Sequence, residues 1–120
     1  MLKKRIKSFG YAFKGIATLF QTQPNARIHL TALIGVIIAG FYFKINTTEW
    51  CLIALVSGCV LGLEAANTAI EFVVDLVSPD HHHLAGKAKD VAAAAVLLMA
   101  FGAIAVGLLV FLPKIALFFH

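Results

Sequence analysis

The chain has 120 residues, of which 61% are hydrophobic and only 13% are charged. A soluble domain of this size carries a more polar surface, so the composition argues against that class and favours an integral membrane protein. The formal net charge is +4, but no basic patch with interleaved aromatic side chains is present, so nucleic acid is not an expected partner.

The segment 1–22 is predicted to form an amphipathic helix in the membrane interface. Its large apolar residues recur at helical spacing on one face, and lysines share another face: Leu2, Ile6, Phe9, Phe13, Ile16 and Phe20 against Lys3, Lys7 and Lys14. Two interpretations stay open, an anchor that only packs and orients, and a helix whose lysines also meet phosphate. The sequence TQPN at 22–25 should end this helix, because the residue before a proline is disfavoured in helical conformation.

Three apolar blocks follow, at 28–45, 50–77 and 91–112. A helix needs about 17–25 residues to cross about 30 Å of hydrocarbon, so each block is long enough to span. The breaks KINTTE and SPDHHHLAGKAK separate the blocks and are expected to be loops. We therefore expect an all-α membrane protein with one domain over 1–120, built from an N-terminal surface helix and three transmembrane helices.

Positive charge predicts the orientation of these spans. The basic residues before the first span and in the second loop outnumber those on the other side by eight to two: Lys3, Lys4, Arg5, Lys7, Lys14, Arg27, Lys87 and Lys89 against Lys44 and Lys114. Short cytoplasmic loops are enriched in Lys and Arg, so the N-terminus and the second loop should be cytoplasmic.

The most unusual feature is a polar stripe inside the second apolar block. In EAANTAIEFVVD at 64–75, Glu64, Asn67, Glu71 and Asp75 fall within an arc of roughly 80° on a helix. Inserting one ionised carboxylate at a bilayer centre costs about 2.5–3.5 kcal/mol of free energy. Such residues are therefore rare in membrane helices, and the stripe indicates a functional site. Counting inward from Trp50 at about 1.5 Å per residue, Glu64 lies roughly 21 Å deep and Glu71 reaches the cytoplasmic boundary. A lipid headgroup and a water-soluble cosubstrate could meet at that depth.

The second loop would supply groups of complementary chemistry at the same surface. Lys87 and Lys89 can hold phosphate oxygens, and carboxylates can hold Mg²⁺, which are the parts of a phosphoryl-transfer site. No GxxxxGK[ST] or GxGxxG pattern is present, so no common nucleotide fold is indicated. Asp90 could alternatively cap the third span. The adjacent histidines 81–83 cannot all face one ion, and an interfacial loop with polar caps explains them better.

A few other residues have structural interpretations. Cys51 and Cys59 are expected to be small buried hydrophobes without a disulfide. Trp50 and Tyr42 are expected to be anchors at the outer interface. The alanines at 92–95 predict a close helix–helix contact.

The stripe EAANTAIEFVVD and the following HHHLAGKAKDVAAAAVL, together with GYAFKG and NARIHL near the N-terminus, resemble the prokaryotic diacylglycerol kinase family, which includes the undecaprenol kinases. The resemblance covers most of the chain. It implies a homotrimer in the bacterial cytoplasmic membrane, with active sites shared between subunits, that moves the γ-phosphate of MgATP onto a lipid alcohol.

The resemblance also implies roles for individual residues. Glu64 is expected to be the catalytic base and Glu71 a Mg²⁺ ligand. A larger set is expected to bind nucleotide or substrate: Lys4, Lys7, Lys14, Asn67, Asp75, Lys89 and Asp90. The chain departs from the family pattern at Gln23, where the family normally has a further metal-binding glutamate. Gln23 can still offer an amide oxygen, without the charge.

The sequence leaves the acceptor lipid open and argues against two other functions. The acceptor can be diacylglycerol or undecaprenol, because both present one primary hydroxyl at the interface. A proton or cation conduit would want polar residues to continue above Glu64, where only Ser57 and two cysteines occur. A structural subunit whose acids merely pair Lys87 and Lys89 does not explain the graded depth of the stripe.

Overall fold

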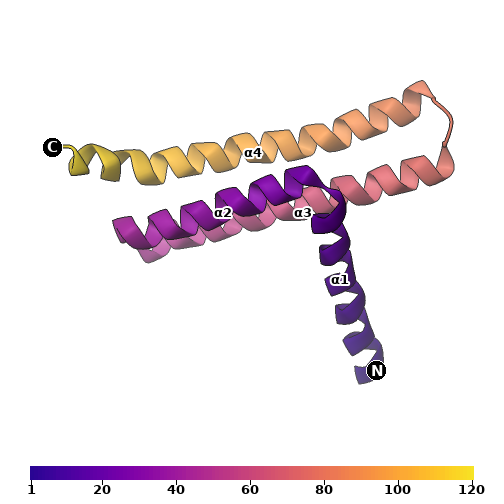
Figure 1. The fold of residues 1–120 in the computed structure, drawn as a ribbon, viewed down its shortest axis with the longest axis horizontal. Helices are drawn as coiled ribbons and strands as arrows, with labels where there is room; N and C mark the ends of the chain where they lie inside the picture. The colour runs from indigo at the N-terminus through magenta and orange to yellow at the C-terminus, as the bar shows by residue number, and fades with distance from the viewer.

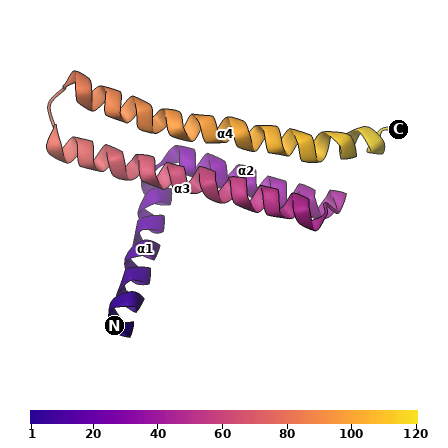
Figure 2. The ribbon, with the colours of Figure 1, turned by 180° about the vertical axis from the view of Figure 1, so that it is seen from behind.

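A computed structural model describes all 120 residues as four helices, with no strand: α1 (Leu2–Thr22), α2 (Pro24–Phe43), α3 (Thr47–Val77) and α4 (His83–Phe118). Helices α2, α3 and α4 lie side by side, and α1 leaves this bundle at a steep angle near the start of α2 (Figures 1 and 2). The predicted all-helical fold, with one amphipathic helix before three long apolar helices, is confirmed.

The ends of the helices follow from local sequence. Pro24 occupies the first turn of α2, where its missing N–H needs no partner, so the chain turns sharply between α1 and α2. The backbone N–H of Glu49 donates to Asn46 Oδ1 at 2.8 Å, and the N–H of Asn46 donates to Glu49 Oε1 at 3.0 Å. This reciprocal capping box fixes the start of α3.

The connection between α3 and α4 is much shorter than predicted. Helix α4 begins at His83, and the backbone N–H of Leu84 donates to His82 Nδ1 at 3.1 Å. The prediction of a loop through Lys89 is therefore wrong, and so is the alternative that Asp90 caps the helix. Residues 84–90 contain mostly good helix formers and no proline, so the helix extends beyond its apolar part.

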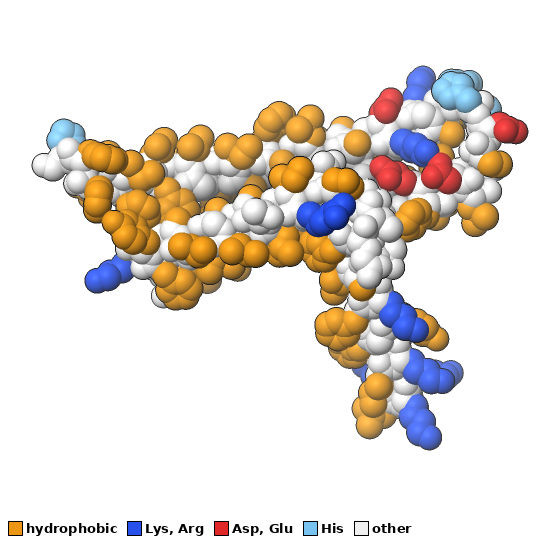
Figure 3. Space-filling view, in the orientation of Figure 1, with side chains coloured by type: hydrophobic (Ala, Val, Ile, Leu, Met, Phe, Trp, Pro, Cys, Tyr) orange, Lys and Arg blue, Asp and Glu red, His pale blue; other side chains and the backbone are white.

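Helices α2, α3 and α4 are each long and apolar enough to cross a membrane. The 31 residues of α3 and the 36 of α4 correspond to about 46 and 54 Å, so both extend beyond about 30 Å of hydrocarbon. Only 12 of 120 residues are buried, and large apolar side chains cover the outer surface of the three helices (Figure 3). These features are those of a multi-pass membrane protein.

The end of the bundle opposite the α3–α4 turn is held by packing and one ion pair. Trp50 packs against the apolar cluster of Ile45, Ile53 and Val110 and approaches Gly40 closely. Lys114 Nζ lies 2.8 Å from Glu49 Oε2, which joins α4 to the first turn of α3. Trp50, expected as an interfacial anchor, therefore has a packing role in this structure.

Two further expectations concern small residues. Cys51 and Cys59 are free, but both are exposed on the surface of α3, so the prediction that they are buried is wrong. The apolar pattern of one helix does not reveal which of its side chains stay exposed. Ala92 is buried near the start of α4, in line with a close helix contact at the predicted alanine stripe.

Candidate active site

The polar stripe lies on one face of α3 with steadily increasing exposure. Glu64 is 2% exposed and Asn67 is 8% exposed, whereas the Asp75 side chain is 62% exposed. Glu71 lies between them and is half-buried. The stripe thus runs from the interior of the bundle towards the α3–α4 turn, where acidic, basic and histidine side chains gather (Figure 3). This is the depth gradient that the sequence predicts.

Glu64 is the most deeply buried large side chain of the molecule. The Thr68 hydroxyl donates to the backbone carbonyl of Glu64 at 2.9 Å, so it does not serve the carboxylate. The Oε2 atom of Glu64 is buried and has no hydrogen-bond partner. A buried acceptor without a partner is uncommon and expensive, and it marks the carboxylate as a functional candidate.

The nearest charged or ionisable neighbour of Glu64 is His29, on the second turn of α2. Its Nε2 lies 3.3 Å from Glu64 Oε2, within ion-pair distance but without the alignment of a hydrogen bond. No role for His29 was predicted from the sequence, although His29 belongs to the motif NARIHL. The sequence does contain a feature that indicates such a role, because His29 is an ionisable side chain inside an apolar span, and residues of this kind commonly mark functional sites.

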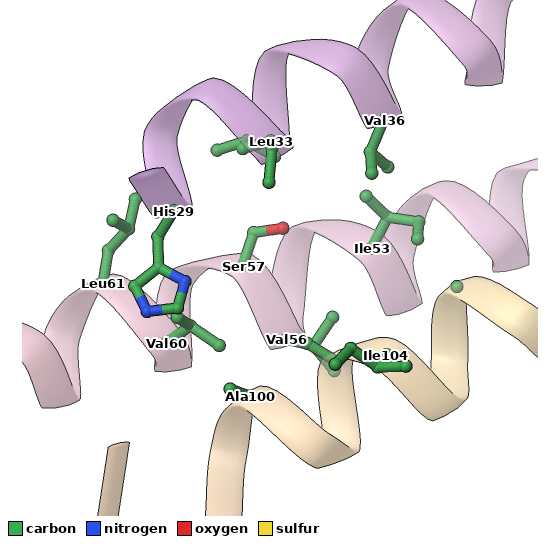
Figure 4. Close-up of a pocket in the computed structure, with 13 residues that line it drawn as sticks. His29, Leu33, Val36, Ile53, Val56, Ser57, Val60, Leu61, Ala100 and Ile104 are labelled. Atoms are coloured by element: carbon green, nitrogen blue, oxygen red, sulfur yellow. The ribbon is translucent and has the colours of Figure 1, made fainter. Parts of the chain in front are cut away.

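His29 also forms one end of an apolar groove between α2, α3 and α4, with a volume of about 320 Å³. Figure 4 shows His29 beside Val60 and Leu61, with Val36 and Ile53 towards the other end of the groove. Apart from His29 and Ser57 its lining is apolar or glycine: Ala32, Leu33, Val36, Ile53, Val56, Val60, Leu61, Ala100, Ala103, Ile104 and Gly107. The apolar groove therefore ends at His29, next to the buried carboxylate of Glu64.

Asn67 and Glu71 form the next part of the site. Asn67 Nδ2 donates to Glu71 Oε1 at 3.4 Å, and the buried Asn67 Oδ1 has no hydrogen-bond partner. Oxygen atoms of this kind suit Mg²⁺. The structure contains no cluster of three His, Cys, Asp or Glu residues able to hold a metal ion.

Gln23, where the resemblance expects a further ligand, lies at the corner between α1 and α2. Its Nε2 donates to the hydroxyl of Thr22 at 3.4 Å, and its backbone N–H donates to Leu19 at 2.9 Å. Leu19 of α1 and Thr68 of α3 both line a second groove, which lies between α1 and α3. The corner thus lies beside the stripe, but the Gln23 side chain makes no hydrogen bond to it.

At the outer end of the stripe, Lys89 of α4 pairs with Asp75 of α3. Lys89 Nζ lies 2.5 Å from Asp75 Oδ1, in the part of α4 that precedes the apolar span. The hydrogen bond that Lys89 donates to the Asp75 carboxylate raises the pKa of Lys89 above its ordinary value, so the ammonium group stays charged. The pair borders a polar cavity of about 300 Å³ that also involves Asp80, His81 and His82. Asp90 is exposed and makes no ion pair.

The lysines of α1 lie apart from the stripe within one protomer. Lys4, Lys7 and Lys14 are exposed and form no ion pair with Glu71 or Asp75. Figure 3 shows basic side chains of α1 well separated from the acidic cluster at the α3–α4 turn. Only the C-terminal half of α1 lies near α3, where Ala12, Gly15, Ile16 and Leu19 line a groove, whereas Phe9 and Phe13 of its apolar face stay exposed. A phosphate-binding role for these lysines stays a prediction.

Comparison with known proteins places the chain among bacterial lipid kinases. Residues 10–111 match the family model of prokaryotic diacylglycerol kinase. An undecaprenol kinase of Bacillus subtilis is 43% identical over 114 residues, covering 95% of this chain and 93% of the relative. A diacylglycerol kinase of Synechocystis is 44% identical over 109 residues, covering 90% of this chain and 62% of the relative.

A diacylglycerol kinase of Escherichia coli K12 is 30% identical over 93 residues, covering 78% of this chain and 76% of the relative. The matched segment 10–111 includes the whole polar stripe, Gln23, His29 and the Lys89–Asp75 pair. The chain therefore belongs to the prokaryotic diacylglycerol kinase family, a family of lipid kinases.

Proposed function

We propose that the protein transfers the terminal phosphoryl group of MgATP to the hydroxyl group of a membrane lipid, with diacylglycerol and undecaprenol as the two candidate acceptors. One observation carries the proposal. The buried Glu64 Oε2 has no hydrogen-bond partner and lies beside an apolar groove, while the rest of the stripe leads from it towards water. A lipid hydroxyl could supply the missing donor.

Glu64 is assigned the role of general base. A hydroxyl that reaches the His29 end of the groove would donate its hydrogen bond to Glu64 Oε2 and then lose its proton to the carboxylate. A positioned base of this kind typically contributes 10²–10⁴-fold to a rate. The apolar lining of the groove is compatible with a hydrocarbon chain, and the burial of Glu64 excludes most of the water that would compete for the phosphoryl group.

The other members of the stripe are assigned to the nucleotide. Glu71 is seven residues from Glu64, about 10 Å along the helix, and Asp75 is about 6 Å further. Glu71 and the free oxygen of Asn67 would hold Mg²⁺, which would neutralise charge on the transferred group. The charged Lys89 would bind phosphate oxygens, and Asp75 and Asp90 the remaining nucleotide groups.

The proposed reaction balances with these groups. The acceptor oxygen forms a bond to the γ-phosphorus as the bond from that phosphorus to the β,γ-bridging oxygen breaks. The hydroxyl proton moves to Glu64, and ADP and the lipid phosphate are the products. Glu64 later returns its proton to solvent, so the enzyme is regenerated.

We further propose that the protein works as a homotrimer in the bacterial cytoplasmic membrane, with its N-terminus in the cytoplasm. The excess of Lys and Arg on the side of the N-terminus and the α3–α4 turn supports this orientation. One protomer leaves many large apolar side chains exposed on its three long helices, which suits packing between copies as well as contact with lipid. Lys4, Lys7 and Lys14 could then act on the site of another protomer.

The test is phosphate transfer by the purified protein in lipid bilayers. With Mg²⁺ and ATP labelled at the γ-phosphate, we expect labelled phosphatidic acid from diacylglycerol, labelled undecaprenyl phosphate from undecaprenol, or both. The matched control is the same lipid with its hydroxyl methylated, which should accept no label. Absence of transfer to either lipid by folded protein would refute the proposal.

A further inference from the structure

We propose that His29 is a positioning residue for the catalytic carboxylate, holding the Oε2 atom of Glu64 at the end of the lipid-facing groove. This inference rests on the proposed function, because Glu64 is the base only if the protein is a kinase. No motif or role assigned to the stripe includes His29. Its assignment comes from its position in space, 35 residues before Glu64 in the chain.

The first argument is that His29 is the sole ionisable partner of Glu64. Glu64 is 2% exposed, and its Oε2 lies 3.3 Å from His29 Nε2. Burial of an unpaired carboxylate is costly, so a nearby donor has a disproportionate effect on its charge and orientation. A small rotation of the imidazole would align Nε2–H with Oε2 and complete the missing hydrogen bond.

The second argument concerns what surrounds the imidazole. On α3, Glu64 is the only carboxylate within ion-pair distance of His29. The α4 wall of the groove carries no charge, since it consists of Ala100, Ala103, Ile104 and Gly107. On α2, Arg27 is exposed, and no acid of α1 faces His29, because α1 contains none. His29 is therefore free to serve Glu64 alone.

The third argument is that His29 belongs to both parts of the site. It contacts the carboxylate, and it also forms the end of the apolar groove (Figure 4). No other residue that lines the groove makes an ion pair or hydrogen bond with the Glu64 carboxylate. An acceptor hydroxyl entering from the groove would reach Oε2 next to this ring, so the position of the ring decides how the carboxylate is presented.

The experiment compares His29→Ala, His29→Gln and Leu33→Ala in the lipid kinase assay. Leu33 is the matched control, because it lies one turn further along α2 and lines the same groove. We expect His29→Ala to lower kcat by about 10- to 100-fold with little change in KM for ATP, as for loss of a hydrogen bond to a charged group. His29→Gln, which keeps a donor, should recover most of kcat. Leu33→Ala should act mainly on KM for the lipid.

The outcomes separate this inference from the proposed function. If wild-type protein transfers phosphate and His29→Ala keeps its full kcat, or His29→Gln is no better than His29→Ala, the positioning role is wrong and the kinase function stands. If wild-type protein transfers no phosphate to any lipid, both fall together.

A second measurement does not depend on turnover. The ¹⁵N signals of the His29 ring should move when Glu64 is replaced by Gln, whereas those of His120, just beyond the C-terminal end of α4, should stay in place. Unchanged His29 signals would show that the two side chains do not interact in the membrane-embedded protein, and would overturn the inference.

Discussion

The replacement Glu64→Gln tests the central assignment with the least structural disturbance. Glutamine has nearly the same size and shape as glutamate and keeps a carbonyl oxygen, but it cannot take a proton from an alcohol. Because Glu64 is 2% exposed and its Oε2 has no hydrogen-bond partner, the change removes a buried charge without breaking a hydrogen bond of that atom. The fold should therefore tolerate the substitution.

The expected magnitude follows from the role. A positioned general base contributes about 10²–10⁴-fold, so kcat should fall by that factor, which is about 2.7–5.4 kcal/mol in the barrier. Nucleotide binding should be nearly unchanged, because the Lys89–Asp75 pair lies 11 residues away, about 16 Å along α3. Thermal stability should also stay within about 2 °C of the wild type, since side-chain volume is conserved.

Three measurements on the same preparation check this combination. Transfer of label from ATP to lipid gives kcat, fluorescence of a nucleotide analogue gives binding, and thermal unfolding in detergent gives stability. Loss of kcat with intact binding and stability is the expected result. If Glu64→Gln turns over within about threefold of the wild type, Glu64 is not the base, and the argument from its buried, unpartnered oxygen fails.

Three other changes have distinct expected results. Glu71→Gln should raise the Mg²⁺ concentration needed for half-maximal rate by about tenfold or more, because a charged ligand is lost; an unchanged Mg²⁺ titration would contradict the assignment. Gln23→Glu should lower that concentration, by about two- to tenfold, if the corner beside the stripe can supply a ligand, and the same titration measures it. Gly40→Ala should lower the free energy of unfolding by about 1–3 kcal/mol, since a Cβ there would lie 2.5 Å from a ring carbon of Trp50. Gly58→Ala, where a Cβ meets nothing within 4 Å, is the control in the thermal unfolding assay, and equal effects of the two would refute the packing argument.

Much of the candidate site was predictable because it lies on a single helix. The spacing of Glu64, Asn67, Glu71 and Asp75 places them on one face of any α-helix, and counting residues from Trp50 gives their order in depth. The structure confirms both the shared face and the gradient of exposure. The boundary between α1 and α2 at Pro24 was also predictable, because a proline restricts the backbone of the residue directly before it.

The start of α4 was not predicted, because two local tendencies compete there. The histidines and charged residues of 81–90 suggested a loop, yet most of them are compatible with a helix that continues beyond the membrane. The exposure of Cys51 and Cys59 was also missed, since an apolar residue on a membrane helix can face either a neighbouring helix or lipid. The sequence pattern of one helix does not distinguish these two environments.

The sequence by itself therefore determined the class of protein, its three spans and the polar stripe of α3, because composition and helical periodicity are local properties. Only the tertiary structure decided which residues of other helices meet that stripe. His29 of α2 reaches Glu64, and Lys89 of α4 reaches Asp75, because the helices pack at one particular rotation and depth. Such contacts depend on packing between segments far apart in the chain, which no local spacing specifies.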